Sequence, residues 1–201
     1  MSDHLTAVLA MLGPAENHYA DPGAWDRLHA ELGVRLPSDY RFLVDAYAPI
    51  ELNDDLYLPH PATGRWNLGE WIQETVRSWS EIPWEQLHLE ADEDPQPLVA
   101  PRTLGFGTAD GLWPLARADD DTLFLDAGST TPRLLVEDEN RIWTEYPMSF
   151  AEWLHRYLNG EEMTGPWSAT PDPGPVKLRR LPMSRSERPE PWWGPELRDS
   201  P

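Results

Sequence analysis

Carboxylates are the most abundant side chains in this sequence that could do chemistry. The chain of 201 residues has 35 Asp and Glu against 16 Lys and Arg, and it has no Cys. The absence of Cys excludes disulfides, thiolate nucleophiles and Cys-based metal sites. The sole lysine, Lys177, follows no glycine-rich loop. This argues against a phosphate-binding loop and against a Schiff-base enzyme.

The histidines are scattered along the chain. No two of them have the i, i+4 spacing with which a helix presents two ligands to one metal ion. His88 and Glu90 are close enough to share an ion but have no further ligands beside them. We therefore expect structural or solvated histidines, and neither a metal nor any other cofactor. A carboxylate pair suited to hydrolysis is not excluded, because so many acids produce close pairs by chance.

Acidic residues also occur in runs, at 90–94, 119–121 and 137–139. One interpretation is that each run is a solvated loop that discourages association between sheet edges. The sharper hypothesis is an anionic face that binds a basic protein, formed by Asp119, Asp120, Asp121, Glu137, Asp138 and Glu139. Three consecutive Asp lack the alternating spacing of a calcium-binding loop, so a protein partner is preferred over a calcium site, and a solvated loop remains the favoured interpretation of any single run.

Tryptophan is unusually frequent, with 11 in the chain. Four fall on apolar helical stripes, where core packing is expected: Trp25, Trp71, Trp79 and Trp153. Trp66, Trp84 and Trp113 fall in predicted loops or edge strands. Core packing is favoured for each of these three as well, but Trp66 and Trp113 are retained as partner-binding candidates because binding anchors are often aromatic.

The net charge of −19 bounds the class of partner. Binding phosphates requires cationic side chains, so a nucleic-acid partner is not expected. No stretch approaches the ~20 apolar residues that cross a bilayer, and the first residues lack the pattern of a secretory signal. We therefore expect a cytoplasmic, monomeric protein that does not associate with membranes.

Apolar residues at helical spacing predict the elements that position these side chains. The expected helices lie at 2–12, 22–32, 37–48, 67–79 and 149–158. Ser149 and Glu152 have capping-box spacing at the start of the last one, and Gly160 is placed to end it.

Alternating apolar residues predict the strands, which lie at 56–58, 104–106, 112–115, 122–125, 133–136 and 141–146. Pro114 predicts an edge or bulged strand. The fold class is α+β, with N-terminal helices packed on a mainly antiparallel sheet that a C-terminal helix closes. We expect residues 1–165 to form one domain and the proline-rich segment 166–201 to be disordered or loosely docked.

Three segments resemble the SUKH superfamily, which includes fungal cell-wall assembly regulators and many bacterial immunity proteins. They are Trp25–Tyr47 with its Leu36-Pro37-Ser38-Asp39-Tyr40 entry, the strand–turn–strand at Leu112–Phe124, and the Met148–Leu154 helix start. The resemblance covers about residues 20–160. It departs at Ala116, where the family usually has Gly, and in the 119–121 turn, which lacks the expected Gly.

The resemblance implies a binding module without catalytic residues. We therefore expect a non-enzymatic immunity protein that neutralises a cationic toxin domain by direct binding. A regulatory scaffold that binds an endogenous protein is the alternative, and a carboxylate-based hydrolase is a third hypothesis. A neighbouring toxin gene would favour the first of these hypotheses.

Overall fold

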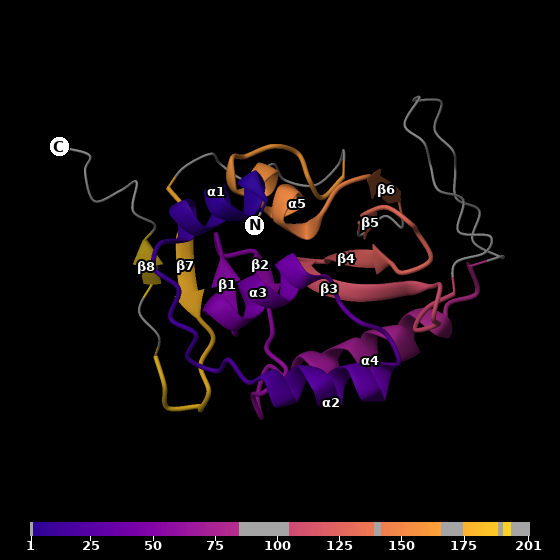
Figure 1. Ribbon diagram of the computed structural model, residues 1–201, viewed down its shortest axis with the longest axis horizontal. Coiled ribbons are helices and arrows are strands. Elements are labelled where there is room, and N and C mark those ends of the chain that lie inside the picture. Colours follow the sequence, from indigo (N-terminus) through magenta and orange to yellow (C-terminus); the bar gives the residue numbers. More distant parts are fainter. Residues whose placement is uncertain (1, 85–104, 139–141, 166–174, 189–190, 194–201) are drawn as a thin grey trace.

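A computed structural model of the chain describes residues 2–84, 105–138, 142–165, 175–188 and 191–193. This part contains five α-helices and one eight-stranded sheet, so the α+β prediction is confirmed (Figure 1). The helices are α1 (Asp3–Leu12), α2 (Pro22–Leu32), α3 (Ser38–Tyr47), α4 (Leu68–Ser80) and α5 (Phe150–Leu158). The strands are β1 (Ile50–Leu52), β2 (Leu56–Leu58), β3 (Leu112–Ala118), β4 (Asp121–Asp126), β5 (Leu134–Glu137), β6 (Trp143–Tyr146), β7 (Lys177–Arg180) and β8 (Pro191–Trp193). Their order in the sheet is β6-β5-β4-β3-β2-β1-β7-β8, and every neighbouring pair is antiparallel.

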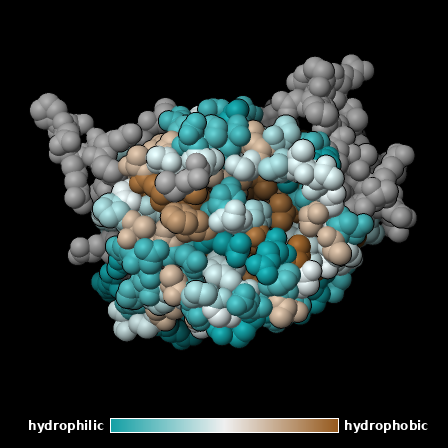
Figure 2. Space-filling view, in the orientation of Figure 1, coloured by the Kyte–Doolittle hydropathy of each residue, from teal (hydrophilic) through white to brown (hydrophobic). Residues whose placement is uncertain are grey.

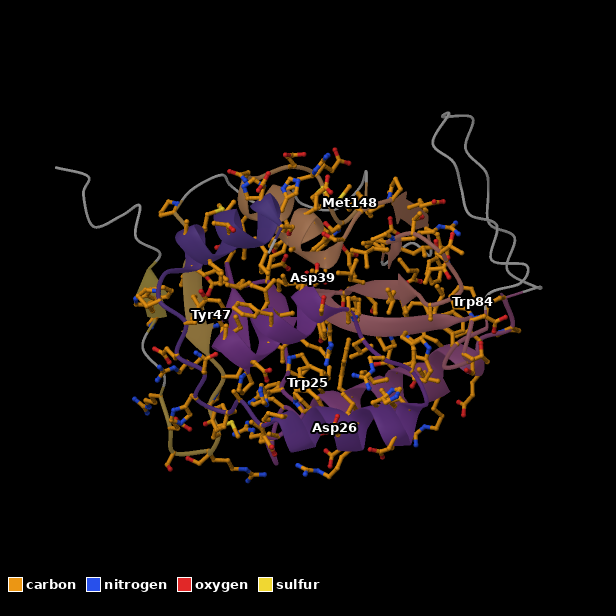
Figure 3. The ribbon with its side chains drawn as sticks, in the orientation of Figure 1. Trp25, Asp26, Asp39, Tyr47, Trp84 and Met148 are labelled. Atoms are coloured by element: carbon orange, nitrogen blue, oxygen red, sulfur yellow. The ribbon has the colours of Figure 1, made fainter. Side chains whose placement is uncertain are left out.

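Most helix starts follow the predicted capping residues. The side chains of Ser2, Asn67 and Ser149 each accept a hydrogen bond from a backbone N–H three residues on. The Asp39 carboxylate, at the start of α3, instead accepts from the Ala151 N–H in the first turn of α5, at 2.8 Å. In Figure 3, Asp39 lies where α3 approaches α5. A carboxylate at a helix N-terminus is stabilising, so this contact ties the first half of the chain to the closing helix.

The register of the sheet sorts side chains onto two faces. Leu52 pairs with Leu56, and Leu56 pairs with Ala118, so these three lie on one face. All three belong to the main hydrophobic core, together with buried residues of the helices. The residues between them in the strands point to the opposite face, because successive side chains of a strand alternate.

The main core is centred on large aromatic residues of α2, α3 and α5. The Tyr40 ring packs edge-on against Phe150, with ring centroids 4.9 Å apart, and also against Trp25 at 6.5 Å. Figure 3 shows Trp25 on the inner side of α2. The Tyr40 hydroxyl donates to the Leu115 carbonyl at 2.7 Å. Leu115 lies in the β-bulge that follows Pro114, so the bulge predicted from this proline is confirmed.

A second, smaller cluster lies on the opposite face of the sheet, and four of its six buried residues are aromatic. Trp79 of α4 packs against Phe124 and Trp143, with centroid distances of 5.2 and 5.9 Å. Trp84 stacks on Trp79 at 5.4 Å, and its indole N–H donates to the Trp79 carbonyl. Core packing, the favoured interpretation for Trp84, therefore agrees with the structure.

Two strands form within 166–201, the segment that we expected to be disordered or loosely docked, so disorder is wrong for these strands. Strand β7 pairs with β1, and β8 pairs with β7 (Figure 1). Leu178 enters the main core, and the flanking Lys177 and Arg179 pair with acids of the β1–β2 hairpin. The charged partners lie far away in the sequence, which is why local composition indicated a disordered segment. Residues 166–174, 189–190 and 194–201 are outside the described part.

Two further strand expectations differ from the structure. Strand β1 was not expected, because its three residues follow a helix directly. In the expected strand at 104–106, Phe106 forms a single bridge to Leu112 and Leu104 lies outside the described residues. The surface over α2 is largely hydrophilic, and hydrophobic residues emerge mainly across the middle of the view in Figure 2. None of the described helices combines the length and apolarity that a membrane span requires.

Candidate functional site

A groove of about 350 Å³ opens on the second face of the sheet, beside the first turns of α4. Its lining consists of Tyr57, Pro59, Trp66, Trp71, Arg117, Asp119 and Leu181. These residues come from β2, the loop before α4, α4 itself, β3 and its turn, and the segment after β7. The groove is therefore a product of the tertiary fold and not of one local motif.

A polar row across four strands places the sheet residues of the groove. Tyr57 pairs with Arg117 on one side and Glu51 on the other, and Glu51 pairs with Arg179. Directly paired residues point to the same face, so all four lie opposite the leucine-lined face. The aromatic cluster around Trp79 occupies the β4–β6 part of this face.

A buried ion pair stands next to the groove wall. Glu51 is 4% exposed and accepts from Arg179 Nε at 2.7 Å and from the Tyr57 hydroxyl at 3.1 Å. The hydrogen bond to Glu51 raises the pKa of Arg179. Burial, followed by the charge of Glu51, raises the pKa of Tyr57. Arg179 and Tyr57 are therefore both hydrogen-bond donors to Glu51.

Trp66 is held rigidly although 37% of it is exposed. Its backbone has a positive φ of 57°, and its carbonyl accepts from the His60 N–H at 3.0 Å. Its indole N–H donates to the Pro182 carbonyl at 3.0 Å. The guanidinium of Arg65 lies 5.3 Å from the centre of the Trp66 ring. Core packing, the favoured interpretation for Trp66, is therefore wrong, and Trp66 stays a candidate for partner binding.

Core packing, the favoured interpretation for Trp113, agrees with the structure, although Trp113 was also kept as a partner-binding candidate. It is 4% exposed and belongs to the main core, and its indole N–H donates to the Thr108 carbonyl at 2.9 Å. Strand β3 lies between β2 and β4 and is not an edge strand. Trp113 is therefore a core residue and is not placed to bind a partner.

The aspartate run at 119–121 is divided by the β3–β4 turn. Asp119 has a φ of 49°, is exposed and lines the groove. Asp120 is also exposed, and its carboxylate lies 3.6 Å from Arg117. Asp121 begins β4 and is only 9% exposed. Two of the three aspartates are therefore available to a partner, and the expectation that Asp121 contributes to an exposed anionic face is wrong.

The acidic run at 137–139 does not form part of an exposed anionic face in its described residues either. Glu137 is 1% exposed, because it lies within β5 between Thr122 and Trp143 in the sheet. Asp138 is 2% exposed and accepts a hydrogen bond from the Ile142 N–H at 2.9 Å. The assignment of Glu137 and Asp138 to an exposed anionic face is wrong, because sheet pairing encloses the first and the turn after β5 encloses the second. Glu139 lies outside the described residues.

A further carboxylate, that of Asp55, lies in the β1–β2 hairpin beside Asp119 but does not line the groove. Asp55 accepts from the Tyr157 hydroxyl at 2.5 Å. Burial raises the pKa of Asp55, and the negative charges of Asp119 and Glu51 raise it further. Burial, together with the neighbouring Asp55, raises the pKa of Tyr157. Negative charge is therefore concentrated around the hairpin and the β3–β4 turn.

The buried histidine of the fold is enclosed by its partners. His60 is fully buried, and its Nδ1 accepts from the Ala62 N–H at 3.0 Å. Its Nε2 lies 3.4 Å from Asp45, which also accepts from the Trp25 indole at 2.8 Å. Burial lowers the pKa of His60 against the opposing effect of Asp45. A general base must reach its substrate, so this geometry suits a structural role.

A pair of histidines lies at the surface between α1 and α5. Nδ1 of His4 and Nδ1 of His155 are 3.4 Å apart. Within the described ranges, no group of three or more His, Cys, Asp or Glu is arranged to hold a metal ion. The candidates His88 and Glu90 lie outside those ranges.

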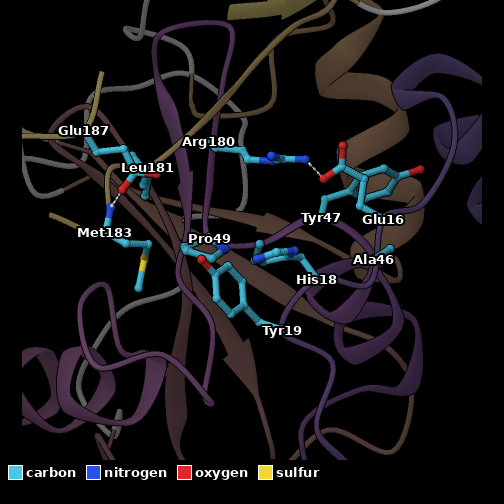
Figure 4. Close-up of a pocket in the computed structure, with 11 residues that line it drawn as sticks. Glu16, His18, Tyr19, Ala46, Tyr47, Pro49, Arg180, Leu181, Met183 and Glu187 are labelled. Atoms are coloured by element: carbon cyan, nitrogen blue, oxygen red, sulfur yellow. Dashed lines mark hydrogen bonds and ion pairs between the residues drawn. The ribbon is translucent and has the colours of Figure 1, made fainter. Parts of the chain in front are cut away.

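A smaller cavity of about 80 Å³ lies beyond Leu181, between the C-terminus of α3 and the segment after β7 (Figure 4). In it, Arg180 pairs with Glu16, and the Glu187 carboxylate accepts from the Met183 N–H at 2.6 Å. It is much smaller than the ~300–1,000 Å³ typical of ligand pockets. Leu181 lines both this cavity and the groove, so the two sites share one wall residue.

Several groove residues were not identified from the sequence. Trp71 was expected in the core, but it is only partly buried and lines the groove. Tyr57 alternates with Leu56 and Leu58, so the two-residue period of the strand could have placed it opposite the core. Nothing local to Leu181 indicated that it belonged to the groove, because its position depends on the pairing of β7 with β1.

Comparisons of the chain with protein-family models, with curated proteins and with solved structures found no match. The similarity to the SUKH superfamily therefore stays a prediction from the sequence. The functional argument rests on the groove, its charges and its exposed aromatic side chain.

Proposed function

We propose that this protein is a non-catalytic binding protein that neutralises a cationic toxin domain by inserting part of it into the Trp66 groove. One observation carries the proposal. Trp66 and Asp119, singled out independently in the sequence as an aromatic and an acidic candidate, line the same groove. Binding interfaces combine such aromatic anchors with a polar rim.

The charge distribution supports a cationic partner. The chain carries a net charge of −19, the exposed Asp119 lines the groove, and the exposed Asp120 is its neighbour in the turn. Complementary charge accelerates association and disfavours partners of the wrong sign. Exposed charges are screened beyond ~8 Å at physiological ionic strength, so this contribution has a measurable salt dependence.

The titratable groups near the groove support binding in preference to acid–base chemistry. Glu51 is occupied by Arg179 and Tyr57, and the Asp55 carboxylate is occupied by Tyr157. His60 has both ring nitrogens directed at protein groups and has no exposed surface. A catalytic acid or base needs an accessible proton, and these groups are instead engaged within the protein.

The test is the kinetics of binding to the partner that the immobilised protein captures from its source cell, across a salt series. Asp119→Lys with Asp120→Lys should slow association at low salt, and increasing salt should slow association of the wild type. Asp26→Lys with Glu162→Lys makes the same charge change at exposed sites outside the groove lining and should have a smaller effect. Asp121 is left unchanged because it is buried.

Equal slowing by both double variants would contradict binding at the groove. Association that is indifferent to salt would contradict a cationic partner. An activity assay of the captured partner, with and without an equimolar amount of this protein, separates toxin neutralisation from a scaffold role. A toxin would lose its activity on binding, whereas a scaffold would leave the activity of its partner unblocked.

A further inference from the structure

We infer that the groove takes one arginine side chain of the protein partner, with the guanidinium at Asp119 and the aliphatic stem between Trp66 and Trp71. This inference rests on the proposed function and specifies its anchor. Four properties of the groove support it: its size, its free carboxylate, its aromatic walls and the balance of charge at its rim.

The size of the groove fits a single long side chain. Its volume of about 350 Å³ lies at the lower end of the ~300–1,000 Å³ range of small-molecule pockets. That volume is too small for a helix lying in a groove but sufficient for one extended side chain. The walls are mostly apolar and suit the methylene stem that Arg and Lys bury along apolar surfaces.

The Asp119 carboxylate is the acceptor that such a side chain would reach. Within the described residues, no hydrogen bond or ion pair joins this carboxylate to another group. Its own backbone carbonyl accepts from Arg117 Nε at 2.5 Å, and Arg117 Nη2 lies 3.6 Å from the Asp120 carboxylate. The Arg117 guanidinium thus contacts the backbone of Asp119 and the side chain of Asp120. The Asp119 carboxylate is left to accept from an incoming donor.

The aromatic walls favour arginine over lysine. Guanidinium groups stack on indole rings and also form bidentate hydrogen bonds with carboxylates. The molecule already uses this contact, since the Arg65 guanidinium lies 5.3 Å from the Trp66 ring centre. Arg65 does not line the groove, so the groove side of Trp66 remains accessible. The hydrogen bond from Trp66 to Pro182 fixes the ring in advance, which reduces the entropy lost on binding.

The balance of charge disfavours an anionic occupant. Arg117 is the one cation among the residues that line the groove, and it is already shared with Asp120. Asp119 lines the groove, Asp120 follows it in the turn, and the Asp119 N–H donates to the Asp55 carbonyl at 3.3 Å, so three acidic residues are neighbours here. An anion would meet this excess of negative charge, whereas a guanidinium would relieve it.

The test uses capped tripeptides as probes of the groove in the full chain. Gly-Arg-Gly is titrated at millimolar concentration while the tryptophan indole N–H signals are followed by NMR. The Trp66 signal, assigned with Trp66→Phe, should shift and saturate. Gly-citrulline-Gly has nearly the same shape without the charge and should bind about tenfold more weakly, because charge-assisted hydrogen bonds are roughly twice as strong as neutral ones.

Two matched variants locate the charge. Asp119→Asn should weaken binding of the arginine peptide about as much as replacing arginine by citrulline weakens binding to the wild type. Both changes remove the same pair of charges. Asn is well tolerated at positive φ, so the turn at φ 49° is preserved. Asp120→Asn makes the same chemical change at a residue that does not line the groove, and the arginine peptide should bind it nearly as well as the wild type.

Equal binding of the arginine and citrulline peptides, or unchanged binding by Asp119→Asn, would overturn the inference. Equal binding of Gly-Lys-Gly would also overturn it, since the groove would then be a general cation site. Failure here is distinguishable from failure of the proposed function. Partner binding that requires Trp66 but is indifferent to Asp119→Asn would remove only the arginine anchor, whereas partner binding indifferent to Trp66→Ala would remove the proposed function.

Discussion

The indole N–H of Trp66 donates to the carbonyl of Pro182, 116 positions further along the chain. This bond joins the loop before α4 to the segment after β7. Leu181, the neighbour of Pro182, donates its own N–H to the Pro49 carbonyl at 3.0 Å and lines the groove. The candidate site therefore depends on the C-terminal segment, which we expected from its composition to be disordered or loosely docked.

A chain that ends at Thr164 should be less stable than the full chain. It loses β7, so β1 becomes an edge strand and Glu51 loses Arg179. If this costs ~2–3 kcal/mol, the melting temperature should fall by roughly 5–10 °C. A chain that ends at Trp193 keeps both strands and is the control. Equal melting temperatures of all three chains would contradict the placement of β7.

Arg179→Ala should destabilise the protein more than Arg180→Ala, although both remove an arginine from β7. Arg179 pairs with the buried Glu51, whereas Arg180 pairs with the exposed Glu16. Removing one partner of a buried pair costs ~3–5 kcal/mol, and the partial exposure of Arg179 reduces this to ~2–3 kcal/mol. The exposed pair should contribute ~1 kcal/mol or less. Chemical denaturation measures both values, and adding Glu51→Gln should recover part of the Arg179→Ala loss.

The sequence predicted elements that local contacts determine. Asn67 and Ser149 each cap a helix through a backbone N–H three residues away, so their effect is visible in a short window. The groove cannot be predicted from a short stretch of sequence, because Tyr57 and Arg117 are brought together only by the pairing of β2 with β3. The same limit explains Trp113, whose burial depends on β3 lying inside the sheet.

Trp153→Ala should be among the most destabilising single changes in the chain. Trp153 is fully buried, stacks on Tyr157 at 5.3 Å and donates its indole N–H to the Met163 carbonyl at 3.0 Å. Removing such a side chain costs ~3–5 kcal/mol. Trp66→Ala is the control, because removing a partly exposed tryptophan side chain should lower the unfolding free energy much less. Comparable losses for the two variants, measured by denaturant unfolding, would be incompatible with this assignment.

Asp55→Asn should stabilise the protein at neutral pH. Burial raises the pKa of Asp55 above its ordinary 3.8, so its charged form is disfavoured in the folded state. The stability linked to its protonation is fully present below 3.8 and is lost as pH rises through the raised folded pKa. Asn keeps an acceptor for Tyr157 without the charge. The gain in unfolding free energy should therefore be largest at neutral pH and shrink toward pH 3.8, and a gain independent of pH would contradict this account.

The acidic runs show what charge patterning can and cannot predict. Asp119 and Asp120 are exposed, as a charged turn usually is, and both lie at the groove or beside it. Glu137 has the same local appearance but is enclosed by Thr122 and Trp143 on neighbouring strands. Runs of charge in a sequence therefore do not distinguish a turn from the end of a buried strand.

The most direct test of the proposed binding site is the rate at which the captured partner dissociates from Trp66→Ala and from Phe42→Ala. These are the two large hydrophobic residues that stand exposed in the described chain, at 37% and 44%, and only Trp66 lines the groove. If Trp66 is a binding hot spot of ~2 kcal/mol, its removal should accelerate dissociation about 30-fold. Phe42→Ala should change the rate about twofold or less. Equal dissociation rates for the two variants, or a larger effect of Phe42→Ala, would contradict binding at the groove.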